Sequence, residues 1–261
     1  LLGNLASWQI VQSAEIDNPT LKDGLHQAIL ESISLLTSRQ GMDGGWGWRE
    51  DEISDLHITT YATLALALAR QAGFTVNEYS INSAGEYLAA NQVSPSPTQL
   101  GWELDRQAFI AYVRTLVDRG DLGSALELYD ERARLSAAGQ ALLALALENL
   151  SSGTQQAATL FSDLQATALR SGSGASWEDV NRGYQNMSST LSTTAIVTYA
   201  LIRHDPGSVL LPDALRFLML SRQADGGWSS TYTTAWSLIT LNAWVQATGE
   251  FQASFAYGAT L

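Results

Sequence analysis

Apolar residues recur along most of the chain at the three-to-four-residue spacing of α-helices, and the alternation typical of β-strands is almost absent. We therefore predict an all-α protein. The connections between helices are short except at 41–56 and 171–189, so successive helices should pair as antiparallel hairpins. The segments expected to be helical are 5–15, 21–39, 57–72, 78–91, 101–119, 121–131, 134–150, 153–170, 190–204, 211–222 and 230–248.

Four of these helices begin with Ser or Thr and continue into sequence that is apolar almost all round. Their openings are at 58–61, 135–138, 191–194 and 231–235. Ser and Thr suit helix N-caps, because the hydroxyl accepts a hydrogen bond from a free backbone N–H. A helix that is apolar on most sides is expected to be buried, so these four should form an inner layer. The more amphipathic segments 21–39 and 211–222 should lie in an outer layer.

One phrase occurs twice, as Ser-Arg-Gln-Gly-Met-Asp-Gly-Gly-Trp at 38–46 and as Ser-Arg-Gln-Ala-Asp-Gly-Gly-Trp at 221–228. It fits the joint between an outer and an inner helix. Glycine permits left-handed backbone at a helix end, and Asp favours a turn. We expect Gln to reach donors at a neighbouring helix end and Trp to pack against the next hairpin. Repetition around a closed ring predicts an α/α toroid of about six helical hairpins, with a short open solenoid as the alternative.

Composition narrows the classes of function. The 261 residues are 46% apolar, as in a globular core-forming chain, and the formal net charge of −12 argues against binding to nucleic acid or an anionic membrane. The sequence contains no Cys, which excludes disulfides, thiolate metal sites and a Cys nucleophile within this chain. It also contains no apolar stretch long enough to span a membrane.

Candidate chemistry is sparse, and we predict no catalytic, metal or cofactor site. His26 is expected at the surface, and His204 at a helix end, where a cation is favourable. His57 begins an inner helix close to the acidic run 50–52. A catalytic or pH-tuned role and simple N-terminal capping both remain open for it. The carboxylates at 50–52 and 130–131 are expected in solvent.

The eight tryptophans form two groups. Five follow turn glycines, namely Trp46, Trp48, Trp102, Trp177 and Trp228, and three lie within helices, namely Trp8, Trp236 and Trp244. Packing between hairpins is the expected use, and a platform for a glycan is the alternative.

The Gln-x-x-Asp-Gly-Gly-Trp phrases resemble those of two groups of helical-ring proteins. The first group contains triterpene cyclases and protein prenyltransferases. Those enzymes need an acidic cluster or a Cys-containing zinc set, and neither is present here. A cyclase-like enzyme stays as an alternative that predicts a deep central cavity lined with carboxylates. A non-catalytic scaffold for glycans or proteins is a third hypothesis.

The second group is the thioester domain of the alpha-2-macroglobulins and complement proteins, and the chain resembles its bacterial members over nearly its whole length. The sharpest match is Gly-Gly-Trp-Ser-Ser-Thr-Tyr-Thr-Thr-Ala-Trp-Ser-Leu at 226–238. Further matches lie at 1–7, 40–48, 54–61, 177–195 and 241–250.

This resemblance implies that residues 1–250 are a toroidal thioester-type domain truncated just after the thioester motif, and that 251–261 lead out towards a neighbouring β domain. It implies a fragment of a broad-range protease inhibitor that traps proteases and has flanking β-sandwich domains in the same chain. It further implies no catalysis by this domain and a periplasmic, cell-envelope or extracellular location. The Cys and Gln of a thioester would lie upstream of Leu1. Some members use a His to assist acyl transfer, and His57 does not clearly match that position.

Overall fold

A computed structural model describes residues 1–49, 52–181 and 184–249. Over these residues the chain is all-α apart from one small hairpin, which confirms the predicted fold class. The α-helices are α1 (Leu2–Ser13), α2 (Pro19–Ser38), α3 (Leu56–Gln71), α4 (Glu78–Asn91), α5 (Gly101–Thr115), α6 (Leu122–Asp130), α7 (Ala137–Leu150), α8 (Gln155–Ala166), α9 (Thr190–His204), α10 (Leu211–Leu220) and α11 (Thr231–Thr248). Two 3-10 turns, η1 (Arg132–Arg134) and η2 (Tyr184–Asn186), and two strands, β1 (Leu169–Ser171) and β2 (Gly174–Ser176), complete the described elements.

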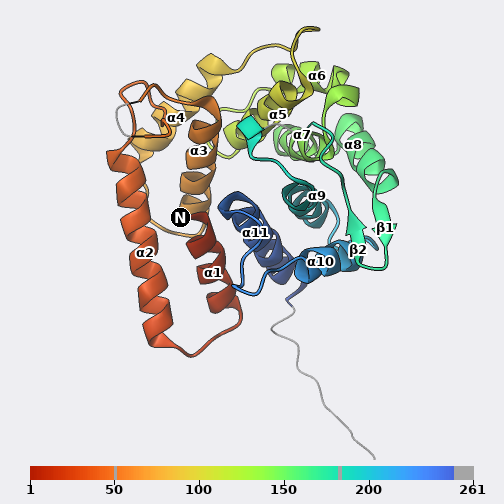
Figure 1. Ribbon diagram of the computed structural model, residues 1–261. Coiled ribbons are helices and arrows are strands. Elements are labelled where there is room, and N and C mark those ends of the chain that lie inside the picture. Colours follow the sequence, from red (N-terminus) through yellow and green to blue (C-terminus); the bar gives the residue numbers. More distant parts are fainter. Residues whose placement is uncertain (50–51, 182–183, 250–261) are drawn as a thin grey trace, which may run out of the picture.

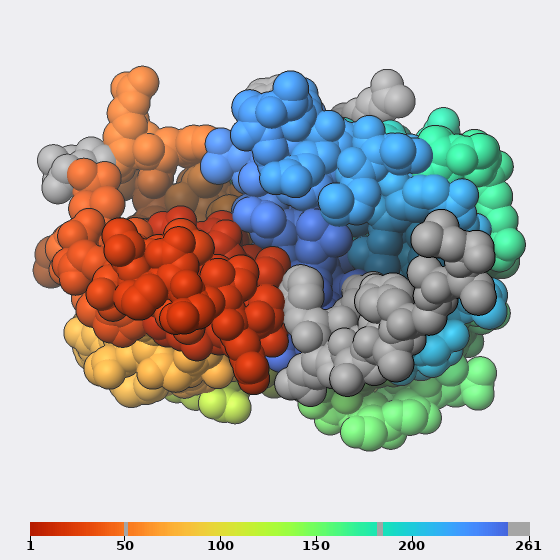
Figure 2. Space-filling view, turned by 90° about the horizontal axis from the view of Figure 1, so that it is seen from below, coloured from red at the N-terminus to blue at the C-terminus, as the bar shows by residue number. Residues whose placement is uncertain are grey.

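The odd-numbered helices form an inner ring, and the even-numbered ones lie outside it (Figure 1). Each inner helix contacts the next in the order α1, α3, α5, α7, α9, α11, and α11 packs against α1 to close the ring. Figure 2 shows this seam, where the first helices of the chain (red) lie against the last (blue). The arrangement is therefore a closed α/α toroid and not an open solenoid.

The predicted inner layer is correct but incomplete. The four helices with Ser/Thr openings are α3, α7, α9 and α11, and all lie in the ring, whereas α2 and α10 lie outside as expected. The ring also includes α1 and α5. Charged residues in the first turns of α5 mask its inner position in the sequence, although Leu104, Ala108 and Ile110 are fully buried.

The segment predicted as one helix over 153–170 is wrong at its end. Helix α8 stops at Ala166, and residues 169–176 form an antiparallel hairpin in which Ser171 lies opposite Gly174. Gly174 has φ +123°, and a Cβ at this position would lie 2.2 Å from the Asp213 carbonyl oxygen. Only glycine allows the hairpin to approach α10 this closely, and this tertiary contact decides the local structure.

A tryptophan–threonine clamp joins each of three outer helices to the inner helix that follows it. In the first clamp the Trp46 indole N–H donates to the Leu36 carbonyl in the last turn of α2 (2.9 Å). The Trp46 backbone N–H donates to Thr59 Oγ1 in the first turn of α3 (2.9 Å). The indole is 4% exposed, so one buried side chain satisfies a free helix-end carbonyl and also packs between the two helices.

The same contacts recur twice around the ring. The Trp177 indole donates to the Leu164 carbonyl of α8 (2.8 Å), and its backbone N–H donates to Thr194 Oγ1 of α9 (3.1 Å). The Trp228 indole donates to the Leu218 carbonyl of α10 (2.8 Å), and its backbone N–H donates to Thr234 Oγ1 of α11 (2.9 Å). The clamp at Trp177 forms without a full copy of the repeated phrase.

Of the four predicted openings, only 135–138 contains the residue that caps its helix, namely Ser136 at the start of α7. Helices α3, α9 and α11 are capped by Asp55, Ser189 and Ser230, which precede their openings, and one Thr of each opening is a clamp acceptor instead. Gln40 also differs from expectation, because its amide donates to the carbonyls of Gly44 and Ser80 and does not reach helix-end donors. Gly44 has φ +88°, and a Cβ there would meet the Ser83 carbonyl at 2.4 Å, so this turn requires glycine as expected.

We predict that Thr59→Val destabilises the fold by about 1–3 kcal/mol, because it leaves the buried Trp46 N–H without an acceptor. Urea unfolding measures the loss. Thr159→Val in α8 is the matched control, because the Thr159 hydroxyl bonds only to the Gln155 carbonyl of its own helix. Equal effects of the two substitutions would show that the clamp contributes nothing specific.

Candidate functional site

Aromatic rings from three inner helices meet inside the ring, towards the amino ends of these helices. His57 and Tyr61 come from α3, Phe109 from α5, and Tyr232 from α11. The His57 ring centroid lies 6.0 Å from that of Phe109 and 6.1 Å from that of Tyr232. Trp236 adds an edge contact to Phe109 at 6.1 Å. Aromatic side chains from separate helices thus fill the ring near its axis.

His57 is 2% exposed, and neither ring nitrogen has a hydrogen-bond partner among the described residues. Burial lowers the pKa of His57 to about 4; Arg106 acts in the same direction, and Asp55 opposes it. The imidazole is therefore neutral at pH 7. The capping role proposed for it is wrong, because Asp55 caps α3 by accepting from Ile58 N–H (2.9 Å).

A small cavity of about 30 Å³ lies beside His57. Ser188 and Thr193 also line it, and their hydroxyl oxygens are likewise buried without partners among the described residues. A space of this size with several polar groups suits one small hydrogen-bonding molecule the size of water. The cavity therefore has room for one such molecule, bonded to these otherwise unpartnered groups.

The described residues of 177–189, which we call the strap, are fastened across this end of the ring. Asn181 Nδ2 donates to Asp105 Oδ2 and to the Arg134 carbonyl, both at 3.0 Å. Asp105 Oδ1 accepts from Ser136 N–H (2.8 Å). Burial raises the pKa of Asp105 to about 6, and nearby Asp179 adds to this, while the hydrogen bonds from Asn181 and Ser136 act in the opposite direction.

The far end of the strap is held by α5. Arg106 donates to Asn186 Oδ1 (3.1 Å) and to the Gln185 carbonyl (3.2 Å), and Asn186 Nδ2 donates to the Trp102 carbonyl (2.7 Å). The next residue, Met187, has φ +53°, a conformation that a non-glycine residue adopts only when its surroundings impose it. These contacts hold Met187 over the amino end of the ring.

Met187 forms part of an apolar hollow of about 370 Å³ beside the amino end of α1. Leu1 and Leu2 line one side, and Tyr61 and Tyr232 line another. The Tyr61 hydroxyl is buried with no partner among the described residues, and burial raises its pKa well above the usual range. No carboxylate lines this hollow among the described residues. The lining of the hollow is therefore mostly apolar and favours an uncharged group.

The structure separates the three histidines. His26 is exposed on α2 as expected, although its ring contacts those of Trp8 and Phe74. His204 ends α9 as expected, and it pairs with Glu148 (2.7 Å) and stacks on Phe161 (centroids 3.9 Å apart). Only His57 lies in the candidate site. The sequence signal that singles it out is its position on a helix that is otherwise apolar.

The predicted acidic clusters do not contribute to this site. Glu50 and Asp51 lie outside the described residues, as does the proposed exit segment 251–261. Asp130 is exposed, and Glu131 pairs with Arg134 (2.9 Å). No signal in the sequence marks Asp105, because its position in the site depends on the strap. Within the described part of the chain, no group of acidic or His residues has the arrangement of a metal site, and no helix is long and apolar enough to cross a membrane.

The tryptophans mostly pack in the interior. Trp46, Trp177, Trp228 and Trp236 are buried, Trp102 is half-buried beneath the Arg106 guanidinium, and Trp48 is 60% exposed. Buried rings cannot stack on a glycan, which counts against the glycan platform. The aromatic filling of the ring likewise counts against a deep, carboxylate-lined cyclase cavity.

The fold defines the chain as a protein of the α/α-toroid class. No protein-family model and no curated protein sequence matches the chain. Among solved structures, it is similar to native alpha-2-macroglobulin of Escherichia coli from domain MG7 to the C-terminus, with a TM-score of 0.67 and 18% identity over 90% of this chain and 37% of that one. It is also similar to Salmonella alpha-2-macroglobulin reacted with methylamine, with a TM-score of 0.69 and 21% identity over 89% of this chain and 15% of that one.

Trypsin-activated alpha-2-macroglobulin of E. coli shows the same likeness, with a TM-score of 0.66 and 20% identity over 93% of this chain and 16% of that one. The chain therefore spans well under half the length of each of these structures. Its fold is that of a region within bacterial alpha-2-macroglobulins, which confirms the resemblance stated from the sequence at the level of the fold.

The shifted pKa values of His57 and Asp105 predict opposite effects of pH on the free energy of unfolding. The pKa of His57 is depressed to about 4, so its contribution is fully present above about pH 6.5 and is lost as pH falls through 4. In His57→Leu we expect this loss, about 3 kcal/mol between pH 7 and 4, to disappear. Urea unfolding across this range tests it, with His26→Leu at the exposed position as the control. A wild-type pH slope in His57→Leu would contradict the assignment.

Asp105 should act in the opposite direction. Its pKa is raised to about 6, so its contribution is fully present below about pH 4 and is lost as pH rises through 6. In a His57→Leu background, which removes the His57 contribution, we expect Asp105→Asn to reduce the fall in unfolding free energy as pH rises from 4 to 6. Urea unfolding of His57→Leu and of the double variant His57→Leu/Asp105→Asn measures this difference. The same pH dependence in both proteins would contradict the expectation.

Proposed function

We propose that this chain is part of a bacterial alpha-2-macroglobulin-like protein that traps proteases of broad specificity. The fold supports this proposal, because a toroid of this kind lies within the alpha-2-macroglobulins of E. coli and Salmonella. In this proposal the toroid presents or shields a reactive group and has no catalysis of its own. Its partners are the trapped proteases and flanking β-sandwich domains of the parent chain, in the periplasm, in the cell envelope or outside the cell.

The apolar hollow beside α1 is the observation that carries the proposal. The resemblance puts the thioester of members that possess one next to the residue corresponding to Leu1, and Leu1 lines this hollow. A thioester survives only where water is excluded, and the Tyr61, Tyr232 and Met187 side chains provide an apolar wall. The strap contacts that hold Met187 thus serve to close the hollow.

Protease trapping is tested on the full-length parent protein. We expect full-length parent incubated with trypsin to suppress cleavage of a large protein substrate by about tenfold or more, and to leave cleavage of a small peptide substrate nearly unchanged, because trapping blocks access and not the protease active site. Both rates are measured on the same mixture. Undiminished cleavage of the large substrate at a molar excess of parent would contradict protease trapping.

A substitution in the strap tests the role of the hollow. In a parent that carries a thioester, Met187→Glu should speed spontaneous thioester hydrolysis, because a carboxylate brings water into the apolar wall. Incorporation of methylamine, followed by mass spectrometry over time, measures the surviving thioester. Val180→Glu is the control, because Val180 lies on the same strap, is 69% exposed and does not line the hollow. Equal rates of thioester hydrolysis in the two variants would contradict the proposal that Met187 shields the thioester.

A further inference from the structure

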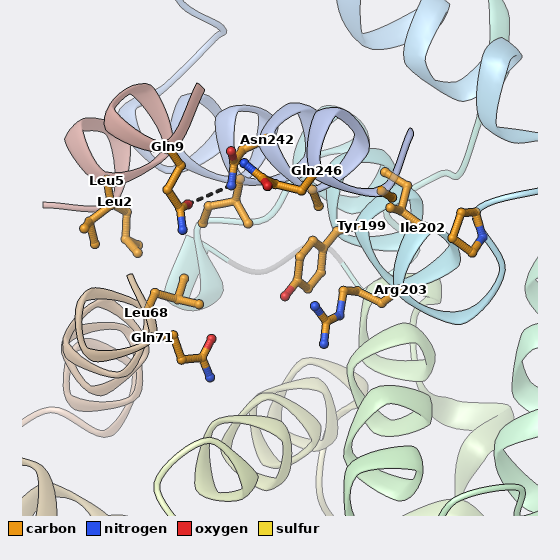
Figure 3. A pocket seen from close by; sticks show the side chains of 15 residues that line it. Leu2, Leu5, Gln9, Leu68, Gln71, Tyr199, Ile202, Arg203, Asn242 and Gln246 are labelled. Atoms are coloured by element: carbon orange, nitrogen blue, oxygen red, sulfur yellow. Dashed lines mark hydrogen bonds between the residues drawn. The ribbon is translucent and has the colours of Figure 1, made fainter. Parts of the chain in front are cut away.

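The opposite end of the ring carries a second hollow, of about 390 Å³ (Figure 3). It is surrounded by the last turns of α3, α9 and α11 together with one side of α1. Three of its residues, Gln71, Tyr199 and Arg203, also line an adjoining hollow of about 430 Å³. The two hollows therefore form one trough at the carboxyl ends of the inner helices. The amino-end site described above does not include any of these three residues.

Three inner helices have an arginine in their last turn, where a cation offsets the partial negative charge of the helix end. Two of these arginines are bonded within the protein. Arg70 of α3 donates to the Leu116 carbonyl (3.0 Å), and Arg114 of α5 donates to Gln92 Oε1. Arg203 of α9 differs, because it is exposed and makes no hydrogen bond or ion pair with a described residue. The donors of its guanidinium are therefore unused.

Arg203 points into the first hollow. Figure 3 shows its guanidinium and the Gln71 amide extending towards one another across this space, from α9 and α3 respectively. Gln71 is also exposed, and its amide makes no hydrogen bond with a described residue. A ligand can therefore reach both groups, and both present N–H donors to the space between them. A carboxylate matches this pair, because its two oxygens accept hydrogen bonds and carry the opposite charge to the guanidinium.

The charges that line the trough favour an anion over a cation. Among the described residues that line the first hollow, Arg203 alone is charged. The adjoining hollow adds Arg70 and Asp118, whose opposite charges lie 3.9 Å apart and offset each other. One positive charge is thus left without a carboxylate, in a chain whose formal net charge is −12. A ligand with a single negative charge complements this surface, and Arg203 repels a cation.

The walls of the first hollow beyond Arg203 are aliphatic. Leu5, Leu68, Ile202 and Ile239 line them. A ligand that consists of a carboxylate alone would leave this surface in contact with water, whereas an aliphatic tail attached to the carboxylate would cover it. The hollow therefore combines a few placed polar donors with apolar walls, which is typical of a site for a small organic molecule.

We propose that this hollow binds a small monocarboxylate with a short aliphatic tail. The carboxylate oxygens accept hydrogen bonds from the Arg203 guanidinium and the Gln71 amide. The tail packs against the aliphatic walls, which include Leu68, Ile202 and Ile239. This site is separate from protease trapping and does not depend on it.

Titration of hexanoate into the 261-residue chain tests the proposal. NMR follows the methyl signals of Ile202 and Ile239 and the Nε–H signal of Arg203. We expect saturable shifts of all three signals with a Kd on the order of 1 mM. Hexanamide keeps the tail but has no charge, and should bind about tenfold more weakly. Acetate keeps the charge but lacks the tail, and should also bind about tenfold more weakly or worse.

Substitutions then locate the site. Arg203→Gln keeps hydrogen-bond donors but removes the charge, and should weaken hexanoate binding about tenfold. Arg170→Gln is the matched control and should leave binding unchanged, because Arg170 is exposed on β1 and does not line the hollow. Gln71→Leu removes the second donor and should weaken binding about threefold. This variant keeps the test decisive if Arg203→Gln does not fold.

Five outcomes would overturn the proposal. These are no shift with hexanoate, equal binding of hexanoate and hexanamide, equal binding of hexanoate and acetate, unchanged binding in a folded Arg203→Gln, or unchanged binding in Gln71→Leu. Shifts of the same signals by acetyl-Gly-Leu with its free carboxylate, but not by hexanoate, would likewise overturn it in favour of the carboxyl end of a peptide. Because the probes contain no protease, failure here leaves the trapping experiment unaffected.

Discussion

The contact on which the toroid depends is the buried indole that joins the end of an outer helix to the start of the next inner helix. Each of the three clamps uses one tryptophan for two tasks that are otherwise in conflict. A helix end has free carbonyls that need donors, and a ring of helices needs apolar surface at every joint. The indole N–H satisfies the carbonyl while the ring system packs, so the polar turn can be buried.

Closure of the ring makes its two ends chemically different. All inner helices run in the same direction, so amino ends gather at one side and carboxyl ends at the other. At the amino side, caps such as Ser136 and Asp55 and the strap satisfy the free N–H groups and leave a neutral His57 among aromatic rings. At the carboxyl side, amides and Arg203 surround another hollow. One scaffold therefore provides an apolar hollow at one end and a polar-rimmed hollow at the other.

The structural roles of the site residues differ in how far the sequence could predict them. His204 was placed correctly because a helix end is a local property, readable from Asp205 and Pro206. His57 was singled out correctly, but the capping explanation failed because capping depends on which side chain points back at the helix start, and Asp55 does so. Asp105 could not be found, because its environment comes from Asn181 and Ser136, which are distant in sequence.

Local sequence was enough to predict that the chain is helical, that its helices pair as hairpins, and that the Gly-Gly-Trp turns connect two layers. These features follow from periodicity and from the backbone freedom of glycine, which act over a few residues. Long-range packing, in contrast, places α1 and α5 in the ring, ends α8 before the hairpin, and brings particular polar groups together in the interior. Burial is a property of packed neighbours, so the pKa of His57 and the two hollows exist only once the ring has closed.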